Sequence, residues 1–217
     1  MAALLAFCVT PLHPASAAVV TWTFEAQVRN ADGDADLIQA LTDLGFVAGT
    51  SIVGSLSFDT TAPDTNPNDD GGFYQNALLS FAASASGVAI VGDGSFNRVA
   101  TTNAAVDRLD ASDGVEIAGL AGRDASFVLT LADSTGSFLA SDRIPLGSYG
   151  LDDFDAYSQT AGLLGTGFHL AVSDGGRFAT LGSELTRLEV TTIPVPTSLW
   201  LFASGLLAVG ARRRCAT

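Results

Sequence analysis

The chain has 217 residues and a formal net charge of −13, with 23 acidic against 10 basic residues. This negative charge argues against a nucleic-acid partner, whose phosphates require a positive field, and against a basic protein that binds membrane surfaces. A hydrophobic content of 47% with only 15% charged residues argues against general disorder, and the length suits one domain with additional end segments.

Residues 1–17 have the features of a secretory signal peptide. Residues 2–9 are apolar, but this run is too short to span a bilayer as a stable helix. Pro11 and Pro14 follow it and would break a buried N-terminal helix, which is the alternative interpretation. Residues 15–17, Ala-Ser-Ala, then match the small-x-small pattern that a signal peptidase accepts. We therefore expect this segment to be removed and the chain to be exported.

Between the two ends, residues 18–192 have the pattern of a β-rich extracellular domain. Residues 20–28 alternate between polar and apolar side chains with a two-residue period, as a half-buried strand does. Similar runs, separated by turns rich in Gly, Asp, Asn and Ser, lie at residues 52–58, 77–85, 88–91, 96–100, 115–120, 126–131, 167–172 and 185–191. Only residues 34–44 carry a helical stripe of apolar side chains. The sequence predicts a mainly β fold, an antiparallel β-sandwich of the jelly-roll type with a short helical insertion.

An acid-rich segment lies between the first two expected strands. Asp32, Asp34 and Asp36 place carboxylates at every second position around Gly33, and calcium prefers about six to eight oxygen ligands. These three aspartates are the candidate calcium ligands, and no other cofactor is expected. The alternative interpretation is a solvated turn that caps the following helix. Residues 64–70 form a second acidic loop with fewer features of a calcium site.

The domain between the ends offers few residues for catalysis. It contains no Cys, no Lys and a single histidine, His169, which excludes thiol nucleophiles, Cys zinc sites and Lys Schiff bases. A Ser–His–Asp triad would have to use His169, which lies in an expected strand and is better explained as a histidine bonded to the backbone. A hydrolase with paired carboxylates is an alternative, since 23 acids will place some pair at a suitable distance by chance. We expect no enzymatic activity.

The other end of the chain is apolar and then basic. Pro194 and Pro196 limit the expected helix to residues 197–211, a length of about 22 Å, which is short for a bilayer core of about 30 Å. We expect a single C-terminal transmembrane helix with the anchor residues Leu199, Trp200, Leu201, Phe202, Leu206 and Leu207. A stop-transfer cluster follows, formed by Arg212, Arg213 and Arg214. The cluster would stay in the cytoplasm and leave the domain outside. A buried C-terminal helix with an arginine cap is the alternative.

The order of these features closely resembles the PEP-CTERM sorting signal of Gram-negative bacteria. The sorting motif would be Pro194, Val195 and Pro196, with Val195 where the family name implies Glu. An apolar helix that begins Leu-Trp-Leu-Phe and a basic tail follow it. In that family the tail is a temporary anchor in the inner membrane, recognised and cleaved by an intramembrane cysteine protease, the exosortase. The resemblance thus implies a sorting tail at residues 193–217, with an exosortase-like protease and the inner membrane as partners.

The domain itself resembles exported proteins that carry this signal. Residues 54–60, 62–67 and 72–74 form a strand ending in Asp, a Pro/Asn/Asp loop and an aromatic pair, a stretch that recurs in such proteins. The resemblance implies a β-sandwich at the cell surface or outside the cell, with a non-catalytic role in the extracellular polysaccharide or biofilm layer. Polysaccharide would then be a further partner. The alternatives are a secreted module that binds glycan, calcium or ice, and a secreted hydrolase with paired carboxylates.

Overall fold

The computed structural model describes residues 18–194, except residues 67, 69, 70, 140, 142, 146–148 and 158–164. Residues Ala18–Ile193 form one unit. In the described residues the strands are β1 (Ala18–Gly33), β2 (Ser51–Asp59), β3 (Phe73–Gln75), β4 (Leu78–Ala85), β5 (Val88–Gly92), β6 (Arg98–Thr102), β7 (Asp107–Ile117), β8 (Asp124–Asp133), β9 (Gly167–Asp174) and β10 (Arg177–Pro194). The helices are α1 (Ala35–Asp43) and the short 3-10 helix η1 (Leu151–Asp153).

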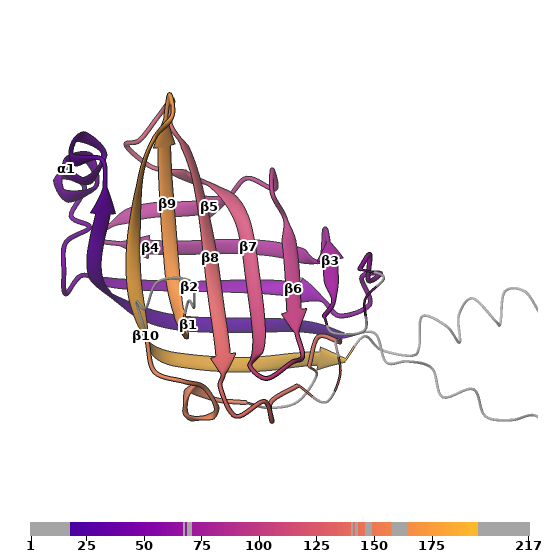
Figure 1. Ribbon diagram of the computed structural model, residues 1–217. Helices are drawn as coiled ribbons and strands as arrows, with labels where there is room; N and C mark the ends of the chain where they lie inside the picture. The colour runs from indigo at the N-terminus through magenta and orange to yellow at the C-terminus, as the bar shows by residue number, and fades with distance from the viewer. Residues whose placement is uncertain are drawn as a thin grey trace, which may run out of the picture. The chain divides into compact units, whose positions relative to one another are not determined.

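The strands form a single sheet that closes on itself. Neighbouring strands follow the order β3-β6-β7-β5-β4-β2-β1-β10-β9-β8, and β8 pairs again with β7, so that eight strands make a closed ring (Figure 1). Strand β7 is long enough to have two partners on one side: its first part pairs with β6 and its last residues pair with β5. Strands β6 and β3 therefore extend outward from the ring as an additional pair.

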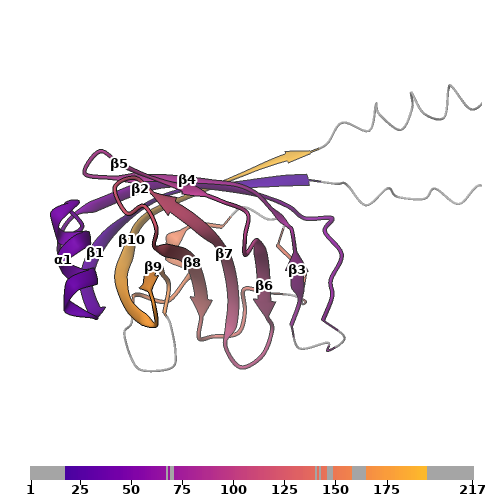
Figure 2. The same ribbon diagram turned by 90° about the horizontal axis from the view of Figure 1, so that it is seen from above.

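Two layers of strands cross each other within this closed sheet. Strands β1, β2, β4 and β5 run side by side in one layer, and β7, β8 and β9 run across them in the other (Figures 1 and 2). The mainly β, antiparallel character with one short α-helix is confirmed. The antiparallel jelly-roll sandwich that the sequence predicted is instead a closed sheet, because β10 pairs with β9 and then continues beside β1, and this long strand joins the layers.

The interior of the closed sheet is filled by aromatic side chains from both layers. Inward and outward residues alternate along the strands, as in β2, where Ile52, Leu56 and Phe58 are fully buried. At the centre, four phenylalanine rings stack on one another: Phe24, Phe81, Phe127 and Phe168. Packing of this kind leaves a solid core, which is the source of stability in a domain without Cys.

Helix α1 connects β1 to β2 and confirms the helix predicted at residues 34–44. Asp34 caps its N-terminus, and Leu37 and Leu41 bury its apolar stripe in the core. Among the described residues, no helix has the length and apolar character needed to cross a membrane. The predicted transmembrane helix at residues 197–211 and the predicted signal peptide at residues 1–17 lie outside the described residues.

Candidate functional site

The last strand leads directly into the predicted sorting motif. Strand β10 ends at Pro194, the first residue of that motif, and proline is tolerated there because the end of a strand can lose a backbone donor. Val195 and Pro196, the anchor residues Leu199, Trp200, Leu201, Phe202, Leu206 and Leu207, and the arginines Arg212, Arg213 and Arg214 lie outside the described residues.

Strand β10 pairs with β9 over Arg177–Ser183, before the end that leads into the motif. It lies between β9 and β1 in the sheet. Two ion pairs join β10 to β1: Arg29 pairs with Glu184, and the Arg187 guanidinium lies 3.2 Å from the Glu25 carboxylate. Strand β1 begins at the edge where β10 ends, so the first and last strands meet at one edge of the domain (Figure 2).

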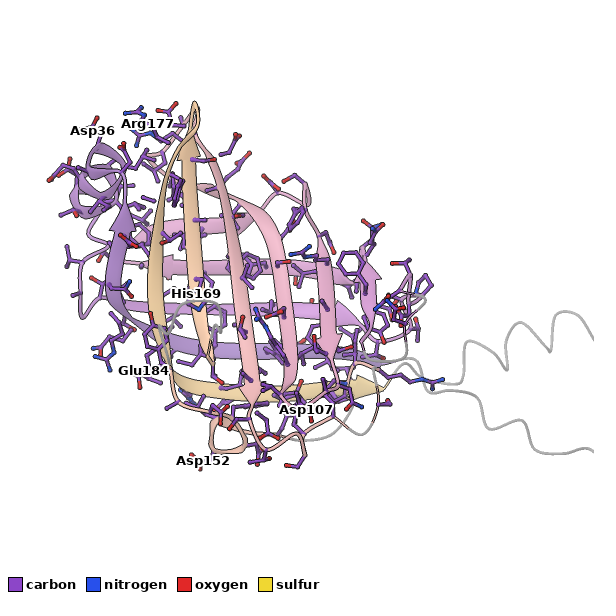
Figure 3. The ribbon with its side chains drawn as sticks, in the orientation of Figure 1. Asp36, Asp107, Asp152, His169, Arg177 and Glu184 are labelled. Atoms are coloured by element: carbon purple, nitrogen blue, oxygen red, sulfur yellow. The ribbon has the colours of Figure 1, made fainter. Side chains whose placement is uncertain are left out.

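The predicted calcium ligands have other partners in the structure. The Asp34 carboxylate accepts hydrogen bonds from the backbone N–H of Asp36 at 3.1 Å and of Leu37 at 3.3 Å, which is a helix cap. Asp36 lies 3.2 Å from the Arg177 guanidinium, and the two side chains lie together at one end of the domain (Figure 3). Asp32 accepts a hydrogen bond from the N–H of Gly33. Calcium at these residues stays a prediction, and no group of three or more metal-binding side chains forms within the described part of the chain.

Other aspartates hold the backbone of their own loops. Asp133, at the end of β8, accepts five hydrogen bonds: two from Thr135, two from Ser137 and one from Phe138. The bond from the Thr135 hydroxyl, helped by the backbone donors of Thr135 and Ser137, lowers the pKa of Asp133 to about 2 against the opposing effect of burial. The acid-rich loops are thus organised by local capping.

One carboxylate pair lies face to face across two strands. Asp107 of β7 and Asp133 of β8 are direct partners in the ladder. Asp107 is fully buried and accepts a hydrogen bond of 2.7 Å from the N–H of Leu139, while its Oδ1 atom has no partner among the described residues. Both carboxylates accept hydrogen bonds from the N–H groups of the loop that follows β8, so the structure shows this pair as an anchor for that loop.

His169 lies on β9, as predicted, and points away from the core. Its ring stacks on Tyr157, with 6.1 Å between the ring centroids. Burial lowers the pKa of His169, the charge of Arg108 lowers it further, and Asp110 opposes both. The expected hydrogen bond to the backbone is absent for Nε2, which is buried with no partner in the described residues.

A family model described as the PEP-CTERM protein-sorting motif matches residues 192–214. The chain is a PEP-CTERM sorting domain-containing protein. The match covers the three motif residues, the predicted anchor and the arginine cluster, and it identifies an exported protein that is targeted by an exosortase at the membrane. Comparison with curated proteins and with solved structures gives no match for the chain.

This PEP-CTERM protein also has a surface hollow that the sequence did not predict. It measures about 230 Å³ and includes Phe73, Phe96 and Arg98 in its lining. Trp22, the tryptophan of the domain, contributes to no such surface, since it is fully buried and donates a hydrogen bond from Nε1 to the Tyr149 hydroxyl. The sequence shows only an arginine two residues after a phenylalanine in a polar turn, and this local pattern does not place Phe73 beside them.

Proposed function

We propose that this PEP-CTERM protein is a non-catalytic component of the cell surface or extracellular matrix, associated with the polysaccharide of a biofilm after exosortase processing. The sorting motif at residues 192–214 carries this proposal. The distribution of charge supports it, since all 23 acidic residues lie in residues 18–192 and none lies in the two ends. Processing at the tail would release a strongly acidic, well-solvated domain.

The tail acts as a temporary anchor in this proposal. The leader sends the domain outward, the apolar segment stops in the inner membrane, and the three arginines stay in the cytoplasm. The exosortase then recognises Pro194, Val195 and Pro196 and separates the domain from the anchor. Because β10 ends at Pro194, the protease meets this motif immediately after the folded sheet.

Cell fractionation with and without the exosortase tests the sorting proposal. Cells of the source organism should release a shortened chain, and deletion of the exosortase gene should leave the full-length chain in the membrane fraction. Replacing both Pro194 and Pro196 with Ala should have the same effect as the deletion. The control Ser204→Ala, in the apolar segment, should be processed normally. Full-length protein that stays soluble inside the cell, uncut at both ends, would contradict the proposal.

A secreted binding module is the second candidate function. The hollow beside Arg98 supports it, because an exposed aromatic ring next to polar side chains is a common arrangement for sugar recognition. This observation favours a glycan over calcium or ice as the ligand. The two candidate functions are compatible, since a matrix protein can bind the polymer around it.

A further inference from the structure

Arg98 is clamped between two aromatic rings on the outer face of the sheet. Its guanidinium carbon lies 4.4 Å from the ring centroid of Phe96 and 5.6 Å from that of Phe73. Phe73 belongs to β3 and Arg98 begins β6, and these two strands pair outside the closed ring (Figure 1). Such cation–π contacts fix the guanidinium plane while leaving its edge available.

The charge of Arg98 is not neutralised by any carboxylate that the structure describes. Five other arginines of the domain lie within 4.0 Å of an acidic side chain: Arg29, Arg108, Arg123, Arg177 and Arg187. Arg98, like the exposed Arg143, has no such partner in the described residues, and its Nε atom donates to the neutral Ser112 hydroxyl at 2.9 Å. Arg98 differs from Arg143 in its contacts with two aromatic rings, and a guanidinium that is held in this way without an acid partner is suited to an external anion.

The loop that carries Phe96 is fixed in position before any ligand binds. The buried Asp113 carboxylate accepts hydrogen bonds from the N–H groups of Gly94 and Phe96, both at 3.2 Å. The neighbouring Asn97 accepts a hydrogen bond from the N–H of Leu78 at 2.9 Å. Phe96 itself is 51% exposed, so a large apolar ring is held rigidly in contact with water. A rigid aromatic surface loses little conformational entropy on binding.

We propose that Phe73, Phe96 and Arg98 form a binding site for a hexuronic acid residue of an acidic polysaccharide. The guanidinium edge would hold the sugar carboxylate with paired hydrogen bonds, and the exposed face of Phe96 would cover the C–H face of the pyranose ring. Gln75, which also lines the hollow and pairs with Arg98 across the strands, offers an amide to the ring hydroxyls. The inference deepens the proposed function and depends on it for the location of the polymer.

We test this site by measuring how tightly the full chain, purified in detergent micelles, binds to polygalacturonate. The wild-type protein should bind immobilised polygalacturonate and should not bind dextran, a neutral polymer. Arg98→Gln should weaken binding about tenfold or more, because a charge-assisted contact is lost. The matched control is Arg187→Gln, an exposed arginine that is paired with Glu25 and Glu189 and should bind as the wild type. Equal binding of the two variants, equal binding to dextran, or no binding would overturn the proposal.

Two further measurements distinguish a specific sugar site from the bridging of two acidic polymers by divalent cations. Phe96→Ala removes an exposed ring and should also weaken binding, while thermal unfolding shows that the domain stays folded. The affinity should persist in EDTA, whereas a loss of binding on chelation would show cation bridging and contradict the proposal. Failure of this site leaves the sorting function intact, because Arg98→Gln does not alter residues 192–214 and cell fractionation reports on processing alone.

Discussion

At the scale of single residues, the aspartates of this protein act mainly as acceptors for backbone N–H groups. Asp34 caps a helix, Asp113 holds the loop with Phe96, and Asp133 holds the turn after β8. Each carboxylate replaces the backbone hydrogen bonds that a loop cannot make for itself. The high acid content therefore contributes to the structure of the loops as well as to solubility.

The Asp133 carboxylate should make a measurable contribution to stability. Asp133→Asn removes the charge that accepts five hydrogen bonds and should lower the free energy of unfolding by about 1–3 kcal/mol at neutral pH. Because the folded pKa is about 2, below the ordinary value of 3.8, the contribution is present above pH 3.8 and is lost as the pH falls toward 2. Urea unfolding across this range measures it, with the exposed Asp124→Asn as the control. An equal loss in both variants would contradict the role of Asp133.

His169 should make the domain less stable in mild acid. Burial keeps its folded pKa below 6.5, so the unfolded chain binds the proton more readily as the pH falls. The free energy of unfolding should therefore decrease as the pH falls from 7 through 6.5 toward the lower folded pKa. The groups that face the His169 ring are Tyr157, Arg108 and Asp110. His169→Gln should reduce this dependence in denaturation curves at pH 7 and pH 5. A variant with the same pH dependence as the wild type would refute this expectation.

At the scale of elements, the close packing of neighbouring strands requires a glycine at one position of β2. Gly54 lies in β2 beneath the aromatic core, and a Cβ atom there would lie 2.7 Å from both the Phe24 ring and the Ala83 methyl group. Both neighbours are packed in the interior, so the strand would have to shift. The glycine therefore permits the contact between β1, β2 and β4.

Replacement of this glycine should destabilise the fold. Gly54→Ala should lower the free energy of unfolding by about 1–3 kcal/mol, because it overpacks the core. Gly150→Ala serves as the control, since a Cβ atom at Gly150 would meet nothing within 4 Å. Urea denaturation of the two variants gives the comparison. A variant at Gly54 as stable as the control would show that the core can accept the added methyl group.

Strands and helices whose apolar side chains recur with a regular period could be predicted from the sequence. Strands that form because neighbouring strands pair with them could not. Strand β2 and helix α1 match the predictions at residues 52–58 and 34–44. The sequence predicted a strand at residues 115–120, whereas β7 begins at Asp107 and alternates the charged Arg108 and Asp110 with apolar residues. These charged side chains point outward while Leu109 and Ala111 are buried, and the strand is held by β6 and β8 on either side. Pairing over such distances is not encoded in a local pattern.

The same limit explains which site residues the sequence could provide. The sorting motif is continuous in the chain and could be recognised from residue types and order alone. Asp34 as a helix cap follows from its position before an apolar stripe. The hollow around Arg98 could not be predicted, because Phe73 and Phe96 are brought together only by the pairing of β3 with β6.

At the scale of the whole molecule, residues Ala18–Ile193 should fold without the two ends. A closed sheet with a continuous aromatic core does not depend on the leader or the tail, and both cysteines, Cys8 and Cys215, lie outside this unit. The purified domain should unfold in one cooperative thermal transition, and the transition temperature should not change with a reducing agent. Calorimetry measures this. A transition that requires residues 1–17 would show that the leader is part of the core.

The position of β10 also has a mechanical consequence for the mature protein. Any force applied at the processed C-terminus enters the domain at the Pro194 end of this strand, where β10 lies beside β1, while its hydrogen bonds to β9 lie further along at Arg177–Ser183. A segment with one neighbouring strand can be peeled away one bond at a time, but a segment with a neighbour on each side must separate from both of them. Under load, residues 184–194 should therefore yield before the Arg177–Ser183 segment through which β10 closes the sheet.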